Sequence, residues 1–338
     1  NVQENSDAYF HARSIEQMTA LIVNHTCEQE TVLANQPPFA NAGANYTIPR
    51  NTPFILDGSA SSDPNGDVLT YCWEQYNNNN GGAQPPTPSN TAGPVFRSVM
   101  PTTDPTRTFP NLEAIINNVT PTWEVLPNVA RTMNFRLTVR VNNSLVGQTR
   151  NANMMVTVNN SGPFVISSPN TGSELWYAGE TKTVTWNVNS TNSLSANVNI
   201  KLSTDGGYTY PITLVSNTPN DGAQNITVPN VVSNRARIKI EAATNIFFDI
   251  SNQDFEIKKG TFDFVATDFT IPVCKPNTAS FTFAYEKAPD FNQTVTLALQ
   301  NLPAGVTASF SPTTVSTNQN VTVTLTGTGA LAAGSYPI

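Results

Sequence analysis

The chain has 338 residues, with 24 Asp and Glu against 17 Lys and Arg, which gives a formal net charge of −7. This length predicts two or three domains, and the acidic balance, with no cationic cluster longer than Lys258-Lys259, argues against a nucleic-acid partner. No run of about 18 apolar residues occurs, so we expect no membrane-spanning helix.

The first predicted element is an amphipathic helix over residues 6–22. Ser6 and Asp7 suit a helix N-terminus, and apolar residues then recur at three- and four-residue steps. These are Ala8, Ala12, Ile15, Met18 and Ile22. An apolar stripe has to pack on something, and the β-rich sequence that follows shows no evident need for it. We therefore interpret residues 1–35 as the helical remnant of an upstream domain plus a linker.

A first strand-rich module is predicted over residues 36–160. Three of its strand candidates alternate with period 2, as half-buried strands do. The candidates are 46–48, 53–56, 68–74, 133–141 and 152–158. Residues 76–110 are rich in Asn, Gly and Pro, and we interpret them as an insertion that is either mobile or functional.

Two further modules are predicted over residues 161–258 and 259–338, the last of which we expect to be truncated. Their strand candidates are 183–188, 198–203, 225–228, 236–241, 279–283, 294–299 and 321–325. Turn signals separate these runs at the spacing of sandwich folds. The predicted fold class is therefore all-β, with three tandem immunoglobulin-like sandwiches after one N-terminal helix.

Composition favours a secreted or cell-surface location. Only 12% of the residues are charged, about half the usual share, and Asn, Thr and Ser supply the polarity instead.

The cysteines are Cys27, Cys72 and Cys274, an odd number without zinc spacing. We expect Cys72 to be a buried free thiol, whereas Cys27 and Cys274 have no assignable partners.

Asp63, Asn65 and Asp67 place three oxygen side chains at alternate positions, as a calcium ion requires. Position 6 of this run is Val68 and not the glycine of an EF-hand, and a strand follows it. The alternative is a hairpin turn in which the Asp and Asn side chains bond their own backbone. Both interpretations stay open, with calcium as the only metal considered for this chain.

The sequence predicts no catalytic residue. Residues 203–209 match the Asp-box of β-propeller hydrolases, but a propeller repeats this motif in several blades, so a single hairpin turn is the better interpretation. His11 and His25, the only histidines, lack zinc-ligand spacing. Without a nucleophile–base pair or a phosphate loop, we expect no enzyme activity and no cofactor in this chain.

Residues 39–73 carry an ordered set of short motifs. Residues 39–43 read Phe-Ala-Asn-Ala-Gly, and residues 56–73 hold an Asp-Gly-Ser turn, an Asp-Pro-x-Gly-Asp hairpin and a Tyr-x-Trp strand. This order resembles the polycystic-kidney-disease (PKD) domain and its cadherin-like relatives. The resemblance implies an immunoglobulin-like sandwich, from which the insertion after Gln75 departs.

Residues 6–18 resemble the last helix of reprolysin-like zinc metallopeptidases that Bacteroidetes-type bacteria secrete. Residues 203–210 and 247–251 resemble sandwich modules of the same secreted proteins, and residues 302–307 and 333–338 are similar to immunoglobulin-like domains appended to bacterial glycosidases and peptidases. The resemblance implies that a catalytic zinc would belong to an upstream domain, because the chain lacks His-Glu-x-x-His.

The resemblance leads to two functional hypotheses. The first is a non-catalytic accessory region of a secreted zinc metallopeptidase, acting as a spacer and as substrate- or surface-binding modules. The alternative is a cell-surface adhesion protein with no associated peptidase. Either way we expect protein or glycan surface ligands and a monomeric chain.

Overall fold

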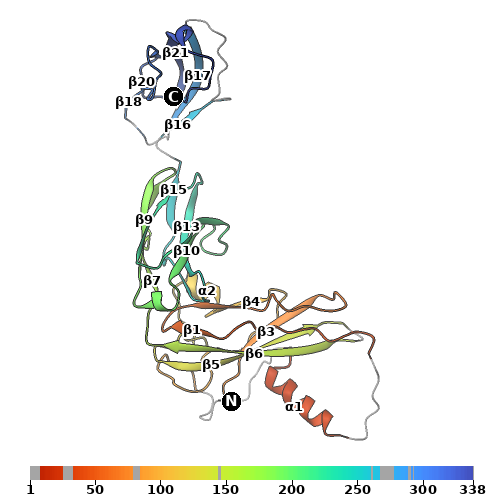
Figure 1. The fold of residues 1–338 in the computed structure, drawn as a ribbon. Helices are drawn as coiled ribbons and strands as arrows, with labels where there is room; N and C mark the ends of the chain where they lie inside the picture. Colours follow the sequence, from red (N-terminus) through yellow and green to blue (C-terminus); the bar gives the residue numbers. More distant parts are fainter. Residues whose placement is uncertain are drawn as a thin grey trace. The chain divides into compact units, whose positions relative to one another are not determined.

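Strands dominate the computed structural model of the chain (Figure 1), which describes residues 8–25, 33–78, 84–143, 146–259, 262–266, 278–287, 291 and 293–337. The predicted fold class is confirmed: one helix, α1 (Ala12–Val23), precedes immunoglobulin-like β-sandwiches. A second short helix, α2 (Leu112–Ile116), lies within the first sandwich. Cys27, Cys274 and most of the run 77–82 lie outside the described residues.

The first sandwich is built from two sheets. The larger has the strand order β1 (Tyr46–Pro49), β6 (Gln148–Asn159), β5 (Arg131–Val141) and β3 (Leu69–Gln75), and the smaller pairs β2 (Phe54–Asp57) with β4 (Thr106–Phe109). Three rings from both sheets meet in the core, with Phe109 stacked on Phe54 at 5.0 Å and edge-on to Phe135 at 5.0 Å. All three are fully buried, and these rings hold the two sheets face to face.

The second sandwich also has two sheets. In the first, β10 (Asn197–Ser203) lies between β11 (Ile212–Pro219) and β13 (Ser233–Ala242), and β14 (Phe248–Ile250) pairs with β13. The second has the order β12 (Ala223–Thr227), β9 (Thr181–Asn187) and β7 (Val165–Ser168). Of these strands, the sequence missed β7, β11 and β14.

The chain divides into two compact units. The first spans residues 1–174, 182–226 and 233–256, and the second spans residues 175–181, 227–232 and 257–338. The three predicted module borders stay a prediction.

The two sandwiches of the first unit are joined by backbone and by side chains. Phe54 of β2 forms a β-bridge with Phe247, flanked by hydrogen bonds from Ile55 N to Ile246 O and from Phe248 N to Pro53 O, both 3.0 Å. The Phe164 ring packs edge-on to Phe247 at 5.3 Å, and both are fully buried. The sandwiches therefore share one continuous core.

Arg237 of β13 makes a second connection between these sandwiches. Its Nη1 donates to the carbonyl of Ile116, the last residue of α2, at 2.8 Å, and its Nε pairs with Asp254. The Asn118 side chain also donates to Asn252 O at 2.7 Å. A helix end with an unsatisfied carbonyl is thus capped by a buried guanidinium from the other sandwich.

Asp249 of β14 makes the stability of this region depend on pH. Its Oδ2 accepts the Ile166 N–H of β7 at 2.7 Å, and burial raises the pKa of Asp249 to about 7, although two backbone N–H donors oppose the shift. The native state therefore binds this proton more tightly than the unfolded chain does. The resulting stability is complete below pH 3.8 and is lost as the pH rises through about 7.

We predict that Asp249→Asn removes this pH dependence. Because the side chain keeps some solvent contact, the expected change between pH 4 and pH 8 is about 1–2 kcal/mol and not the full value of the shift. Urea unfolding of both proteins at each pH measures it. As the pH rises, the free energy of unfolding of the variant should increase relative to that of the wild type. An equal pH dependence of the two free energies would contradict the assignment.

The second unit holds a four-stranded sheet and a two-stranded one. The four-stranded sheet has the order β16 (Phe262–Val265), β17 (Thr278–Lys287), β21 (Gln319–Thr326) and β19 (Thr307–Ser311). The two-stranded sheet pairs β18 (Val295–Thr296) with β20 (Thr314–Val315). Tyr285, Val315 and Val321 form its core. β8 (Leu175–Tyr177) pairs with β15 (Phe255–Lys258), whose last two residues belong to this unit.

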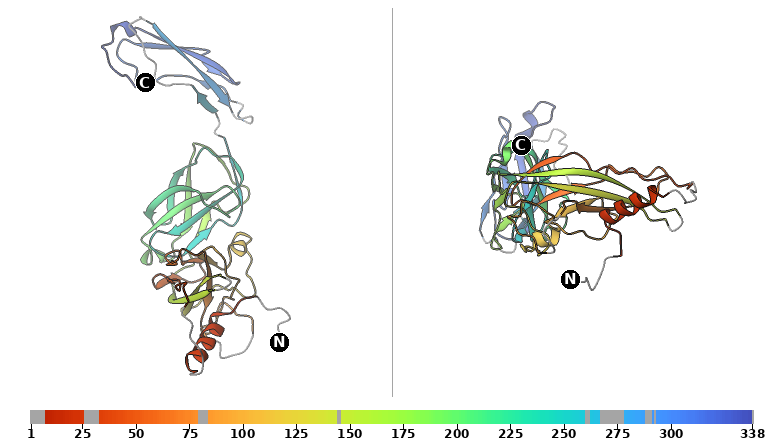
Figure 2. Two further views of the ribbon diagram at one scale, coloured as in Figure 1. Left: turned by 90° about the vertical axis from the view of Figure 1, so that its right-hand side faces the viewer. Right: turned by 90° about the horizontal axis from the view of Figure 1, so that it is seen from below.

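Helix α1 corrects two expectations. It begins at Ala12 and not at Ser6, with His11 as its N-cap residue. Its first turn lies against the first sandwich, as Figure 2 shows, because the Ala12 N–H donates to the buried Glu74 carboxylate at 2.8 Å. The expectation that the β modules have no need of the helix is therefore wrong for its N-terminal end. Its other end is exposed, with Leu21 at 64% and Val23 at 74%.

Candidate functional site

The predicted calcium residues form a self-bonded turn. Asp63 Oδ1 accepts the N–H groups of Asn65 and Asp67 at 2.9 and 3.0 Å. Asn65 Oδ1 accepts Gln36 N–H, and Asp67 Oδ2 accepts the Asn35 amide, both at 2.8 Å. These contacts support the hairpin interpretation. The second oxygen of the Asp63 carboxylate, Oδ2, is buried and has no hydrogen-bond partner among the described residues.

The calcium site itself stays a prediction. No cluster of three or more His, Cys, Asp or Glu side chains suited to a metal occurs in the described ranges. The nearest carboxylate on the following strand, Glu74, accepts the Ala12 N–H of the α1 segment and adds no oxygen to this turn. We expect that calorimetric titration with Ca²⁺ would decide between the interpretations. Heat in the wild type that disappears in Asp67→Ala would establish the ion, and no heat in the wild type would end the hypothesis.

The Asp-box segment is a hairpin turn, as predicted. Asp205 accepts hydrogen bonds from Ser203, Tyr208 and Thr209, and these donors hold the pKa of its carboxyl at about 2. Gly206 and Gly207 adopt φ of +86° and +96°, which this turn requires. The carboxylate is committed to its own turn, so the segment offers no catalytic group.

The predicted insertion is built into the first sandwich. Tyr71 of β3 forms a β-bridge with Thr102, and the Gln75 side chain accepts the N–H groups of Val95 and Phe96 at 2.8 and 3.1 Å. The buried Cys72 thiol donates to Val99 O at 3.4 Å, which confirms the predicted burial of this cysteine. Residues 95–102 therefore cover the outer edge of β3.

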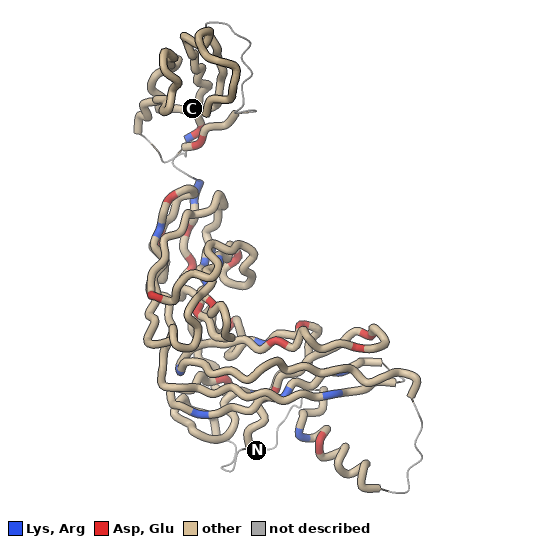
Figure 3. Tube along the Cα trace, viewed as in Figure 1, with Lys and Arg blue, Asp and Glu red and all other residues tan. Residues whose placement is uncertain are grey.

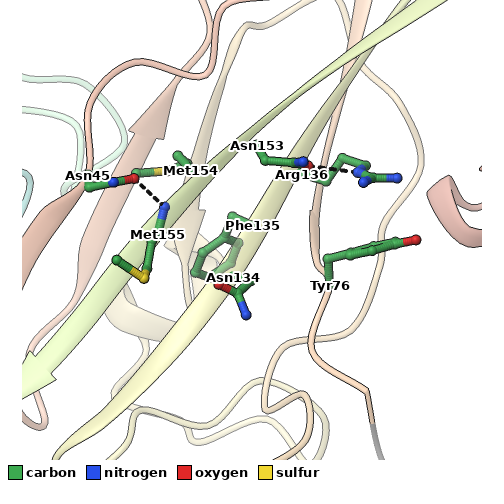
Figure 4. Close-up of a pocket in the computed structure, with 8 residues that line it drawn as sticks. All are labelled: Asn45, Tyr76, Asn134, Phe135, Arg136, Asn153, Met154 and Met155. Carbon is green, nitrogen blue, oxygen red and sulfur yellow. Dashed lines mark hydrogen bonds between the residues drawn. The ribbon is translucent and has the colours of Figure 1, made fainter.

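A groove of about 380 Å³ lies on the outer face of the same sheet (Figure 4). Strand pairing places Asn134 beside Met155 and Arg136 beside Asn153, and Tyr76 follows the end of β3. Its lining residues are Asn45, Tyr76, Asn134, Phe135, Arg136, Asn153, Met154 and Met155. Planar amides around an apolar floor are suited to ligands that both donate and accept hydrogen bonds.

Arg136 is the only cation that lines the groove, and it is held in place from three sides. Its Nε donates to Asn153 Oδ1 at 2.8 Å, its guanidinium carbon lies 3.9 Å from the centre of the Tyr76 ring, and its Nη1 is 3.7 Å from Glu16 Oε1. The ion pair and the ring satisfy the charge. The groove therefore presents a fixed, largely neutralised surface.

Glu74 anchors the segment that leads into α1 on this same face. Its buried carboxylate accepts His11 Nδ1 at 3.0 Å, Ser98 Oγ at 2.8 Å and Ala12 N–H at 2.8 Å. Arg140 Nη2 adds a bond to Phe10 O at 2.8 Å. Three donors on one buried carboxylate fix the start of the helix beside the groove.

Replacing Glu74 by glutamine should release this segment. The amide supplies one acceptor oxygen where the carboxylate supplies two, which should cost about 1–3 kcal/mol of local stability. The amide proton of Ala12 reports the opening by hydrogen exchange, which we expect to become about five- to a hundredfold faster. Glu113→Gln, at an exposed position, is the control. Unchanged exchange in Glu74→Gln would contradict the anchoring role.

Charges of both signs are mixed along the described trace (Figure 3). No helix in the described part of the chain has the length and apolarity needed to cross a membrane. His25, next to the end of α1, is exposed, and His11 is bonded to Glu74.

The sequence did not identify the groove. Its residues come from four segments, residues 45, 76, 134–136 and 153–155, which strand pairing brings together. One signal was available: the run 131–141 carries Asn, Arg and Thr at every second position of a long strand. The structure shows that two of these residues, Arg136 and Arg140, are buried. Buried arginines on a sheet face indicate a covered or binding surface.

Comparisons with known proteins give no family. No protein-family model matches the chain, and no curated protein matches it. Among solved structures, the chain is similar to a nucleoside hydrolase-related protein from Saccharophagus degradans at 19% identity and a TM-score of 0.23, over 37% of this chain and 26% of that one. The chain thus spans about a quarter of the length of that protein.

Two other similar structures cover more of the chain. An I-band fragment of titin is 11% identical over 89% of this chain and 90% of its own, with a TM-score of 0.22. The SGBP-B protein of a Bacteroides ovatus mixed-linkage glucan utilization locus, solved with a heptasaccharide, is 16% identical over 89% and 64%, with a TM-score of 0.18. At these scores the similarities carry no functional argument.

Proposed function

We propose that this chain is a non-catalytic accessory region of a secreted zinc metallopeptidase, with a binding surface on its first sandwich. The observation that carries the binding role is the groove around Tyr76 and Arg136, whose polar groups are fixed by neighbours before any ligand arrives. Fixed groups lose little conformational entropy on binding. The peptidase parent rests on the resemblance of residues 6–18 alone.

The shared core of the first two sandwiches supports a spacer role. A spacer transmits a distance only if its modules do not bend against each other, and the bridge between Phe54 and Phe247 resists such bending. The groove would then be held at a fixed separation from the second sandwich, while the proposed catalytic domain would lie upstream of the first. Zinc would belong to that domain.

Two experiments test the proposal. The coding sequence upstream of Asn1 should contain His-Glu-x-x-His, and a signal peptide directly before Asn1 would refute the peptidase parent. For binding, the full chain is screened on a glycan array and against extracellular-matrix proteins, with Asn134→Ala/Asn153→Ala as the groove variant. We expect at least one ligand whose binding the variant weakens, whereas blank screens would refute the binding role.

The alternative is an adhesion protein of the cell surface with no associated peptidase. It predicts the same groove-dependent binding but no zinc motif upstream. The coding sequence therefore separates the two functions.

A further inference from the structure

The first half of β6 has no paired strand on the side away from β5 in the described chain, and we base our further inference on this edge. Residues 35 and 45 contact its two ends, through Gln148 Nε2 donating to Asn35 O and through Met155 N–H donating to Asn45 Oδ1. β1 pairs with β6 only from Val156 to Asn159, whereas β6 begins at Gln148. Among the described residues, no strand or isolated bridge pairs with residues 148–155 on the side away from β5. The unpaired stretch is about 25 Å long at the rise of an extended strand.

The direction of the open backbone groups follows from a single contact. The Met155 N–H donates to Asn45 Oδ1 at 2.8 Å, on the β1 side of the strand. The register of β6 with β5 is unbroken from Gln148 to Val158, so alternate residues point the same way. The N–H and C=O groups of Asn151 and Asn153 therefore face away from β5. Asn45 supplies one oxygen where a neighbouring strand would place its carbonyl.

The opposite edge of this sheet, unlike the edge of β6, is shielded by a covering segment. The edge at β3 is covered by residues 95–102 through the Tyr71–Thr102 bridge and the Gln75 side chain. Proteins shield their free edges with prolines, lysines, bulges or covering segments. Residues 148–155 of β6 contain no Pro or Lys, and the pairing shows no bulge there.

We propose that this edge binds an extended peptide segment of a partner protein by strand addition. The inference rests on the proposed binding role and names its partner class. The peptide would continue the line of β1, with main-chain hydrogen bonds to Asn151 and Asn153, as in other strand-addition complexes. Alternate side chains of the peptide would lie beside Asn153 and Met155, at the mouth of the groove.

The surroundings define the chemistry of the peptide. Asn134 and Asn153 are exposed amides at the groove, and Arg150 at the edge is exposed. Arg150 Nη1 donates to the carbonyl of Thr149 at 3.1 Å. These groups fit a proline-free peptide with a carboxylate near Arg150 and an amide or carboxylate directed into the groove.

The test uses the full chain and a phage-displayed library of linear octapeptides. The most enriched peptide is synthesised and its Kd measured for three proteins: wild type, Asn151→Ala and Asn151→Pro. The alanine variant keeps the outward N–H, and the proline variant removes it without touching the β5 pairing. We expect Asn151→Ala to bind within about threefold of wild type and Asn151→Pro at least about tenfold more weakly.

Hydrogen exchange supplies an independent measurement. The peptide should slow the exchange of the Asn151 and Asn153 amides in the wild type. If Asn151→Pro fails to fold, Thr149→Pro serves, because its N–H points the same way. Equal affinities for the alanine and proline variants, no enriched peptide, or a dimer of the chain that Asn151→Pro abolishes would each overturn the proposal. If the glycan and matrix screens succeed while the peptide test fails, the strand-addition proposal is refuted and the proposed binding role is retained.

Discussion

Replacing Glu124 by alanine is expected to lower the free energy of unfolding by about 3–5 kcal/mol, because it leaves a buried cation unpaired. Glu124 Oε1 lies 2.6 Å from Arg107 Nη2, with both side chains at most 10% exposed. Burial lowers the pKa of Arg107, while the nearby Glu124 carboxylate raises it. The Glu124 carboxylate therefore offsets part of the cost of burying the Arg107 charge, and this compensation is lost in Glu124→Ala.

The Arg107–Glu124 pair also organises the backbone of the insertion. Arg107 donates to the carbonyls of Trp73 and Arg97, and Glu124 Oε2 accepts two bonds from Asn111, at 2.8 and 2.9 Å. Its loss should release the segment that covers the edge of β3. The segment also contributes the buried apolar side chains of Val95, Phe96 and Phe109. The buried polar bonds add to this apolar anchoring and fix the backbone between the anchors.

Urea unfolding followed by tryptophan fluorescence measures this effect. The indole of Trp73 bonds to Pro105 O at 3.0 Å and reports directly on the region. Glu113→Ala, which removes an exposed carboxylate from the same segment, should change the stability by less than about 0.5 kcal/mol. The double variant Arg107→Met/Glu124→Leu should lose less than the sum of its single variants. A Glu124→Ala protein as stable as wild type would contradict the buried pair.

The sequence predicted the elements that have a strong period. β3 and β5 match their candidates within two residues at each end, because apolar residues alternate along them. β6 was predicted from residue 152 but begins at Gln148. Its first four residues are Gln, Thr, Arg and Asn, which carry no apolar alternation. Half of the unpaired edge, residues 148–151, lies in this polar part of the strand, so its full extent required the structure.

Other features depend on contacts that no local pattern encodes. β4 lies within residues 76–110, whose Asn, Gly and Pro content favoured a loop, and its Phe109 is held by core rings from distant strands. The groove likewise depends on the register of β5 with β6, which pairs Arg136 with Asn153. Register follows from tertiary packing and not from the residues of one strand alone.

Phe247→Ala tests whether the first two sandwiches act as one body. Phe247 is fully buried and lies edge-on to Phe164 at 5.3 Å, so truncation should cost about 3–5 kcal/mol through the cavity that it leaves. Because the same residue forms the β-bridge with Phe54, the loss should fall on the junction. We expect the two sandwiches to unfold together in the wild type and in separate calorimetric transitions in the variant.

Leu137→Ala is the control for this experiment, since Leu137 of β5 is equally buried in the first sandwich. Phe135 would not serve, because its ring lies edge-on to the bridging Phe54 at 5.9 Å. The Leu137→Ala variant should cost a similar free energy without a change at the junction. Hydrogen exchange at Ile55 and Phe248, whose N–H groups bond across the junction, distinguishes the two variants. We expect faster exchange at both amides in Phe247→Ala but not in Leu137→Ala, with each variant compared at the same urea interval below its unfolding midpoint. If Phe247→Ala leaves these amides protected, the ring is not what couples the sandwiches, and the spacer role loses its physical basis.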